Sequence, residues 1–457
     1  MERSVNRSSV PQPDLLATGP SGPRPTLGAR HVAAVVIGIV IGAGIFRTPS
    51  LVAGAAGTET VFLLTWLAGG LLSIIGALCY AELASAFPSA GGDYHFLTRA
   101  FGRRLGFLYA WARLSVIQTG SLALLAFLFG DYASEIVPLG RHSSALYAAA
   151  AVIALTGINW IHVHRGTGSQ LWLTILEVGG LFAVIAAGLL VGSAEASTTE
   201  PSGESSIGLV LVFVLLTYGG WSEGAYLSAE LRGGRRRIAG VLVGSLVLVT
   251  LLYLLVNFAY LRALGLGGVA GSDAVAADLM ERAVGPAGAV LISLLVAVSA
   301  LTSANATSIT GARTTYALGR NFPQLRWLGR WKMRGETPGN ALLAQAAIAL
   351  LLIGAGTFAR DGFQMAVEYT APVFWLFLLL VGISLFVLRV REPEAERPFR
   401  VPLYPLLPAI FCLTSFYLLY SSVAYTGTSA LVGVGILALG AVLLLFLRVP
   451  PEEETCP

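Results

Sequence analysis

The stretch Ile37-Gly38-Ile39-Val40-Ile41-Gly42-Ala43-Gly44-Ile45-Phe46-Arg47-Thr48-Pro49 lies inside the first long apolar segment of the chain. Its closely spaced glycines weaken a helix, because glycine loses more conformational freedom on ordering than any other residue. Pro49 adds to this effect by disfavouring helical backbone at the residue before it. Gly38 and Gly42 also have the spacing of a close-packing face between two membrane helices. A second break elsewhere in the chain would favour a broken helix over a packing face.

The composition is that of a membrane protein. Of the 457 residues, 55% are hydrophobic and 12% are charged, whereas an average soluble domain has roughly 25% charged residues. A spanning helix needs about 20 apolar residues, and stretches of that length recur along the chain. The spacings of Cys79, Cys412 and Cys456 suit neither a disulfide framework nor a metal site. We therefore exclude an ordinary soluble enzyme and expect no metal and no cofactor.

The apolar runs predict an all-α integral membrane protein with twelve transmembrane helices. The helices are expected near residues 31–56, 61–86, 101–130, 145–163, 170–192, 207–230, 238–262, 286–319, 340–357, 365–389, 402–424 and 428–448. The polar segments 1–28 and 449–457 are expected to be cytoplasmic tails, the first of them disordered. Helical patterning around 272–284 suggests a short helix that caps the outer mouth.

Basic residues indicate the orientation, because Lys and Arg are retained on the cytoplasmic side of short loops. Most of the 29 Lys and Arg residues lie in alternate loops, including the run Arg235-Arg236-Arg237. This distribution predicts a multi-pass protein of the plasma or inner membrane with both termini in the cytoplasm. The net charge of +4 is thus explained by topology and lipid contact, and we expect no nucleic-acid partner.

A second interruption occurs five helices after the first, in Thr217-Tyr218-Gly219-Gly220-Trp221-Ser222-Glu223-Gly224. Interrupted helices at corresponding positions of two halves are a sequence sign of the midplane binding site of an inverted-repeat transporter. Unwinding frees amides at the positive end of one half-helix, which attract a carboxylate. Freed carbonyls of the other break can accept hydrogen bonds from an ammonium. The two breaks together predict a site for the head group of an amino acid.

Several motifs resemble those of amino acid–polyamine–organocation permeases. They are Gly42–Pro49, Tyr80-Ala81-Glu82-Leu83 with Phe87–Tyr94, Gly106–Arg113, Gly311-Ala312-Arg313 and Arg397–Pro405, in the order of the family. The resemblance implies a leucine-transporter-type fold, with helices 1–5 (residues 29–192) and 6–10 (residues 207–390) as inverted repeats. Helices 11 and 12 (residues 401–448) would be peripheral.

The resemblance also implies a substrate site at the two breaks. The amides of Gly42, Ala43 and Gly44 would bind the substrate carboxylate, and carbonyls from Leu216 to Gly219 its ammonium. The expected substrate-binding residues are Val40, Ile41, Gly42, Ala43, Gly44, Leu216, Thr217, Tyr218, Gly219 and Trp221. Apolar side chains among them favour a neutral amino acid.

Ionisable groups inside the membrane are costly and are treated as functional hypotheses. Glu177 stands where many family members have a lysine, and we expect it to bind and release a proton while facing Thr302 and Ser303. A structural glutamic acid, or one paired with Arg113, is the alternative. Glu223 follows the second break and is expected to sense protons or to pair with Arg113.

The remaining polar groups have competing interpretations. Thr302 and Ser303 could instead ligate sodium through their hydroxyls. Glu82 closes the second helix beside basic loops and is expected to form a surface salt bridge or to anchor a loop.

The combined prediction is a secondary active transporter that moves an amino acid by alternating access, coupled to protons or by exchange. Alternatives on the same fold are sodium coupling or transport of polyamines or organic cations, and a non-transporting amino-acid sensor is a different class. A channel is disfavoured because no ring-forming filter motif is visible. An intramembrane enzyme is disfavoured because the five histidines lie at helix ends or in loops. The sequence makes no prediction of the oligomeric state.

Overall fold

The computed structural model describes residues 29–89, 91–161, 167–192, 207–226, 237–331, 337–359, 361–424 and 428–446, and the elements within them are helices. The predictions made for the tails at 1–28 and 449–457, and for Arg235 and Arg236, lie outside these residues. The predicted all-α class is confirmed for the described part of the chain.

The first half of the chain begins with the interrupted segment. Its elements are α1 (Ala29–Val40), η1 (Ala43–Phe46), α2 (Thr48–Ala56), α3 (Glu59–Ala86), α4 (Asp93–Phe101), α5 (Arg103–Ala112), η2 (Arg113–Ile117), α6 (Gln118–Ile136), α7 (Ser143–Ile161) and α8 (Thr167–Leu190). The predicted third helix therefore begins after Gly102 rather than at residue 101, and it extends six residues beyond the expected end at 130. η2 is a single π-helical turn within this span.

The second half repeats an interrupted segment at its start. Its elements are α9 (Ile207–Thr217), α10 (Trp221–Tyr226), α11 (Arg237–Ala270), α12 (Val275–Val284), α13 (Pro286–Asn321), η4 (Pro323–Leu325), α14 (Gly339–Gly356), α15 (Gly362–Arg391), α16 (Leu406–Ala424) and α17 (Thr428–Phe446). The short helix predicted around residues 272–284 is present as α12.

Many of these helices are long and apolar enough to cross a membrane. Among the described residues nine pass this test, or ten if Val32–Phe46 and Thr48–Ala56, which are bent by 60°, form one span. Shorter apolar helices occupy Thr174–Leu190 and Ile207–Glu223. The chain is therefore a multi-pass membrane protein, as the composition predicted.

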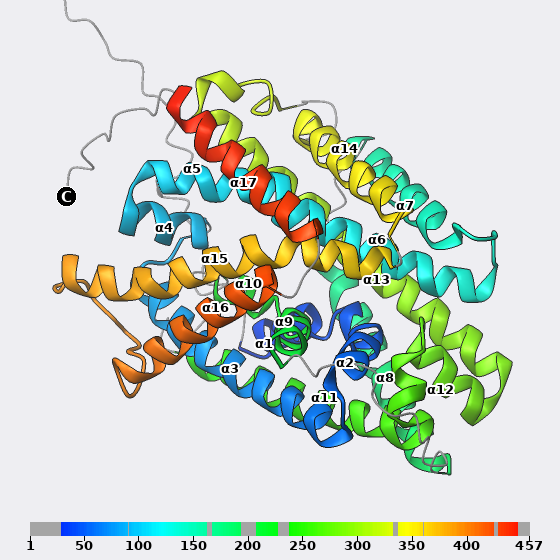
Figure 1. Ribbon diagram of the computed structural model, residues 1–457. Coiled ribbons are helices and arrows are strands. Elements are labelled where there is room, and N and C mark those ends of the chain that lie inside the picture. Colours follow the sequence, from blue (N-terminus) through cyan, green and yellow to red (C-terminus); the bar gives the residue numbers. More distant parts are fainter. Residues whose placement is uncertain are drawn as a thin grey trace, which may run out of the picture.

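The interrupted helices lie in the interior of the molecule. In Figure 1, α1, α2 and α9 occupy the centre, with α3 and α11 along one side and α6, α7 and α14 on the other. α1 packs on α11 and α8, whereas α2 packs on α9 and α11. The site predicted at the breaks is thus enclosed by helices from both halves of the chain.

Burial follows this arrangement. Ile41, Ile45 and Phe46 of the first break have no solvent exposure. By contrast, α16 and α17 present Leu413 and Leu445 at 67% and 80% exposure. Large apolar side chains exposed along one helix face are stable against lipid rather than water, so these peripheral helices supply part of the membrane-facing surface.

Candidate functional site at two interrupted helices

The first interruption separates α1 from α2. α1 ends at Val40, and Gly42 has non-helical backbone (φ −39°, ψ 171°) before the single turn of η1 begins. Pro49 lies in the first turn of α2, where its missing N–H removes no hydrogen bond. Pro49 therefore starts the second half-helix instead of only ending the first. The predicted break is confirmed.

The start of η1 exposes backbone donors. Within the described residues, no side chain caps this short helix at Gly42. The first amides of a helix have no acceptor within the helix, and they carry partial positive charge. The amides of Gly42, Ala43 and Gly44, which we expect to meet a carboxylate, stand at this end.

The second interruption separates α9 from α10. α9 ends at Thr217, and a turn formed by Tyr218, Gly219 and Gly220 leads into α10 at Trp221. Gly220 has φ +96°, a left-handed conformation that favours glycine. A side chain at Gly220 would also come within 2.5 Å of the Ile39 side chain. Glycine is therefore required here both by the backbone and by the approach of α1.

The two breaks meet in space. A Cβ atom on Gly44 would lie 3.5 Å from the methyl group of Thr217, and Gly220 lies against Ile39. Residues about 175 positions apart in sequence thus place the positive end of η1 beside the carboxyl end of α9. These are the two opposite polarities that a zwitterion requires.

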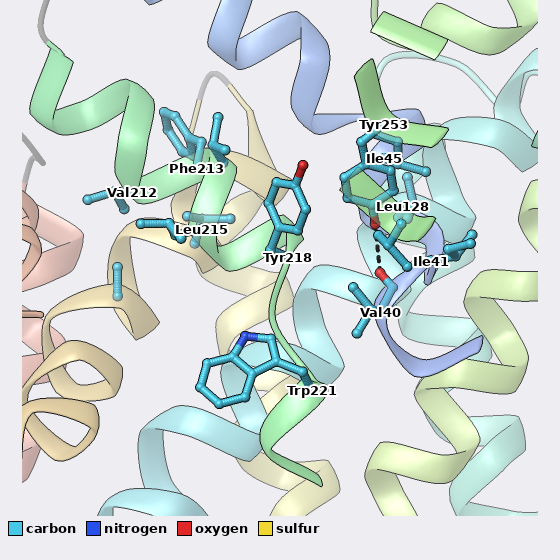
Figure 2. Close-up of a cluster of buried hydrophobic side chains, with 14 of the residues drawn as sticks. Val40, Ile41, Ile45, Leu128, Val212, Phe213, Leu215, Tyr218, Trp221 and Tyr253 are labelled. Atoms are coloured by element: carbon cyan, nitrogen blue, oxygen red, sulfur yellow. Dashed lines mark hydrogen bonds between the residues drawn. The ribbon is translucent and has the colours of Figure 1, made fainter. Parts of the chain in front are cut away.

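Tyr253 on α11 joins the two breaks, as Figure 2 shows for one of its contacts. Its hydroxyl donates to the carbonyl of Val40 at 2.7 Å and lies 3.4 Å from the carbonyl of Thr217. Both carbonyls are at the ends of half-helices and lack helical partners. Tyr253 is not among the residues predicted from the sequence. A buried tyrosine usually finds a partner for its hydroxyl, but the sequence did not indicate which one.

The expected aromatic residues of the second break pack away from this contact. Tyr218 donates to the carbonyl of Trp66 at 3.0 Å, and its ring lies 4.9 Å from that of Tyr253. Trp221 packs edge-on against Tyr80 at 5.1 Å, and in Figure 2 its ring points away from Val40 and Tyr253. Leu216 is partly buried against the core. Of the expected residues, Val40, Gly44 and Thr217 are therefore the ones that direct contacts place at the meeting point.

Glu177 lies within α8 and is 4% exposed. It accepts a hydrogen bond of 2.5 Å from the Ser299 hydroxyl of α13, and its second oxygen has no partner within the described part of the chain. Thr302, which we expected to face Glu177 together with Ser303, donates to the carbonyl of Val298 in its own helix. The hydroxyl that reaches Glu177 therefore belongs to Ser299, one turn earlier on α13.

Glu223 and Arg113 form an ion pair with 3.1 Å between Oε1 and Nη2. Arg113 also donates to the Tyr109 hydroxyl at 3.1 Å, and that hydroxyl donates to Asp93 at 3.2 Å. Two partners are predicted for Arg113, namely Glu177 and Glu223. The structure contains the pair with Glu223, whereas Glu177 accepts a hydrogen bond from Ser299. Arg113 lies on the π-helical turn η2, and such turns are frequent at functional sites.

Glu82 is 2% exposed, so the surface salt bridge considered for it is wrong. Arg389 binds both of its carboxylate oxygens, at 2.7 and 2.6 Å, and the Val401 amide donates to it at 2.7 Å. Glu82 therefore anchors the loop that follows α15, which was the other expectation.

A family model described as amino acid permease matches residues 27–447. The b(0,+)-type amino acid transporter 1 of Mus musculus is 32% identical over 402 residues, which cover 85% of this chain and 80% of the mouse protein. The serine/threonine exchanger SteT of Bacillus subtilis (strain 168) is 27% identical over 413 residues, 89% of this chain and 92% of its own. The human cystine/glutamate transporter is 27% identical over 408 residues, 86% of this chain and 80% of its own. The chain therefore belongs to the amino acid permease family of membrane transporters and is not an enzyme.

Proposed function

We propose that the chain moves an amino acid across the membrane by alternating access, with the substrate held between the two breaks. The observation that carries this proposal is the convergence of the Val40 and Thr217 carbonyls on one hydroxyl, at 2.7 and 3.4 Å. A substrate ammonium can donate to the same two carbonyls and is a stronger donor than a phenol. The amides at Gly42 to Gly44 then meet its carboxylate.

The proposed topology has twelve spans and two cytoplasmic termini. The count adds α8 and the pair α9–α10, whose apolar helices are shorter, to the ten spans described above. Residues 29–192 and 207–390 form the inverted repeats, and 401–448 form the peripheral pair. The support for this division is the recurrence of an interrupted helix at the start of each half.

The proposed substrate is a neutral amino acid, and exchange is the proposed mode of transport. Val40, which lies at the meeting point, and its neighbour Ile41 are apolar and buried. The relative named as a serine/threonine exchanger supports the choice of exchange.

The test is transport by the purified protein in proteoliposomes. Labelled neutral, cationic and acidic amino acids are offered outside, with or without unlabelled amino acid inside. We expect uptake of a neutral amino acid that increases several-fold when the same amino acid is inside. Uptake of cationic amines alone would contradict the substrate class, and binding without any uptake would favour a sensor.

Proton coupling through Glu177 is a second candidate mode, favoured by its burial against Ser299 beside the broken helix. Gly38 of α1 packs directly on Thr174, one turn before Glu177 on α8. A carboxyl at this position can carry a proton between the two states of the first helix. Thr302 and Ser303 remain the candidate oxygen ligands for sodium coupling.

The same proteoliposomes test this mode with Glu177→Gln, which keeps the shape and removes the titratable group. If protons are coupled, an inward pH gradient stimulates the wild-type protein at least several-fold and leaves the variant unaffected. Ser293→Ala, which removes another buried hydroxyl of α13, is the matched control. Equal pH dependence in the wild type and Glu177→Gln would remove Glu177 from the mechanism, and stimulation by a sodium gradient alone would favour the sodium alternative.

A further inference from the structure

The end of α13 and the segment after it are strongly basic. Six basic residues and no acidic one occur from residue 313 to residue 334, namely Arg313, Arg320, Arg326, Arg330, Lys332 and Arg334. The structure describes the first four, and each of these arginines is exposed. We call residues 322–331 the Trp-Arg loop, because they expose Trp327 and Trp331 together with Arg326 and Arg330. Positive charge and indole rings are therefore concentrated at one end of α13.

The Trp-Arg loop is fixed to the rest of the protein by its apolar side chains. Phe322 and Leu328 are each 2% exposed, and the Phe322 ring lies 4.7 Å from the ring of Phe107 on α5. Leu444 of α17 packs against the same buried group, and in Figure 1 the segment after α13 lies near the end of α17. The loop is therefore part of the folded body of the protein.

The backbone of the loop is held as closely. A Cβ atom on Gly329 would lie 2.8 Å from the carbonyl carbon of Gly319, so the loop and the last turn of α13 are in direct backbone contact. The Asn340 side-chain amide of α14 donates to the Trp327 carbonyl at 2.7 Å. The exposed side chains are therefore presented from a fixed backbone, and a ligand that binds them need not order the chain first.

Two indole rings of the loop face outward. Trp327 is 48% exposed and Trp331 is 41% exposed, and the Trp331 ring lies 5.1 Å from the ring of Tyr316 on α13. Indole prefers the boundary between membrane and water, where its apolar body meets acyl chains and its N–H meets water. The two rings therefore mark the level of the lipid headgroups at this end of α13.

The arginines of this segment differ from other arginines on the same side of the proposed topology. Arg99, for example, binds a carboxylate oxygen of Glu392 at 2.6 Å. The four exposed arginines at the end of α13 and in the loop form no ion pair with another described residue. A guanidinium can bind a phosphate through two parallel N–H···O bonds, and basic clusters directly beside the cytoplasmic end of a spanning helix attract anionic lipids. Their charge is therefore available to a phosphate ligand.

We propose that the Trp-Arg loop binds an anionic phospholipid of the cytoplasmic leaflet. Arg326 and Arg330 hold the phosphate, and the rings of Trp327 and Trp331 lie beside the glycerol and the first acyl carbons. The bound lipid fastens the end of α13 to the membrane surface. The assignment of the leaflet rests on the proposed topology, whereas the binding goes beyond the proposed function and needs no transported substrate.

The test is a lipid titration of the purified, delipidated full chain, read out by native mass spectrometry. The probes are phosphatidylglycerol, the zwitterionic phosphatidylcholine, and glycerol 3-phosphate, which has the phosphate but no acyl chain. We expect phosphatidylglycerol to bind about 25-fold more tightly than either of the others, because each of two basic residues near an anionic headgroup strengthens binding about fivefold. Arg326→Gln/Arg330→Gln should remove this difference. Arg262→Gln/Arg282→Gln is the matched control, since it removes two exposed arginines of α11 and α12 and should keep the difference.

Three outcomes of the titration would overturn the proposal. The first is equal binding of phosphatidylglycerol and phosphatidylcholine by the wild type. The second is an equal loss of phosphatidylglycerol binding in the two double variants, because net charge alone would then explain it. The third is tight binding of glycerol 3-phosphate, because the ligand would then be a soluble phosphate compound rather than a lipid.

A second measurement uses the wild type alone and covers the case in which Arg326→Gln/Arg330→Gln does not fold. Phosphatidylglycerol with a photoactivatable group in its headgroup is cross-linked to the protein in nanodiscs, and the labelled peptides are identified. We expect most of the label within residues 313–334, and a several-fold reduction by excess unlabelled phosphatidylglycerol. Label spread evenly over the other basic segments, such as residues 99–104 and 389–400, would contradict the site.

Discussion

The outer cluster and the cluster around Glu82 use the same chemistry in opposite proportions. The outer cluster, which we define as Arg47, Asp131, Asp273 and Asp361, sets one guanidinium among three carboxylates. The inner cluster, which we define as Glu82, Arg389 and Arg397, sets one carboxylate between two guanidinium groups. In the proposed topology the two arginines of the inner cluster lie on the cytoplasmic side, where the positive-inside rule places basic residues.

The two clusters differ in how completely their central residue is bonded. Both oxygens of Glu82 are bound by Arg389, and one also accepts from the Val401 amide. Arg389 stacks on the Tyr404 ring at 3.8 Å, which fixes its orientation. The contacts of Arg47 are uneven, because Asp361 is bound closely whereas Asp131 and Asp273 lie at 3.7 and 3.2 Å, and its Nε has no hydrogen-bond partner among the described residues.

They also differ in what they connect. Glu82 lies near the end of α3, Arg389 lies in the last turn of α15, and Arg397 lies in the loop between α15 and α16, so the inner cluster joins parts outside both broken helices. Arg47 belongs to a broken helix. Buried ion pairs therefore connect different kinds of element in one protein: the inner cluster joins two helices and a loop outside the breaks, and the outer cluster fastens one half of a broken helix to its neighbours.

The largest expected effect is that of Glu82→Gln on stability. This change leaves Arg389 and Arg397 partly buried without a counter-ion, and breaking a buried pair in this way costs about 3–5 kcal/mol. We expect the free energy of unfolding, measured in mixed detergent micelles, to fall by this amount.

Glu59→Gln is the control for this loss, because Glu59 is exposed at the opposite end of α3. A surface substitution of this kind should change stability by less than about 0.5 kcal/mol. If Glu82→Gln were no more destabilising than Glu59→Gln, the inner cluster would not be a structural anchor.

An intermediate effect on stability is expected from Asp361→Asn. Asparagine keeps an oxygen that can accept the hydrogen bond from the Gln364 amide, which Asp361 accepts at 3.0 Å as the cap of α15. The substitution therefore removes mainly the charged bond to Arg47, worth about 1.5–3 kcal/mol. The free energy of unfolding, measured as for Glu82→Gln, should fall by an amount within this range.

Asp273→Asn provides the internal comparison, because Asp273 is 86% exposed whereas Asp361 is 21% exposed. An exposed ion pair is worth at most about 1 kcal/mol, so the free energy of unfolding should fall by less than this amount. A larger loss for Asp273→Asn than for Asp361→Asn would reverse the assignment of the main contact within the outer cluster.

The breaks could be predicted from sequence because their cause is local. Glycines at 42, 44, 219 and 220 act on their own backbone, and their recurrence after five helices indicates a pair of sites. Arg113 and Glu223 could be paired as one of several options, since two opposite charges at similar depth in a membrane attract each other. The structure adds that Gly220 fits directly against Ile39.

The outer cluster could not be predicted, because nothing local identifies its partners. Arg47 lies 226 residues from Asp273 and 314 residues from Asp361. Glu82 could be predicted only as a surface salt bridge or a loop anchor, because its partner Arg389 is 307 residues away. Tyr253 was missed for the same reason, since its acceptor at Val40 is 213 residues away. Interactions at such separations depend on helix packing that hydropathy does not specify.

The smallest expected effect concerns the ion pair between Arg99 and Glu392. This pair lies on the same side of the protein as the inner cluster, outside the membrane-spanning helices. Arg99 donates to both oxygens of Glu392 at 2.7 and 2.6 Å, and these hydrogen bonds lower the pKa of Glu392 below its usual 4.5. Both side chains are partly exposed, at 42% and 30%, so the pair is worth only about 0.2–1 kcal/mol.

Because folding lowers the pKa of Glu392, the pair contributes its full stability above pH 4.5 and loses it as the pH falls through the folded-state pKa. Glu392→Gln should therefore melt slightly below the wild type at pH 7, and the difference should disappear in acid. High salt should reduce the difference as well, through screening. Glu394→Gln, at an exposed glutamate of the same loop, is the control. If the difference in melting temperature persisted in acid, Glu392 would act through packing rather than through charge. The Arg99–Glu392 pair would then differ from both the inner and the outer cluster, whose contacts are ionic.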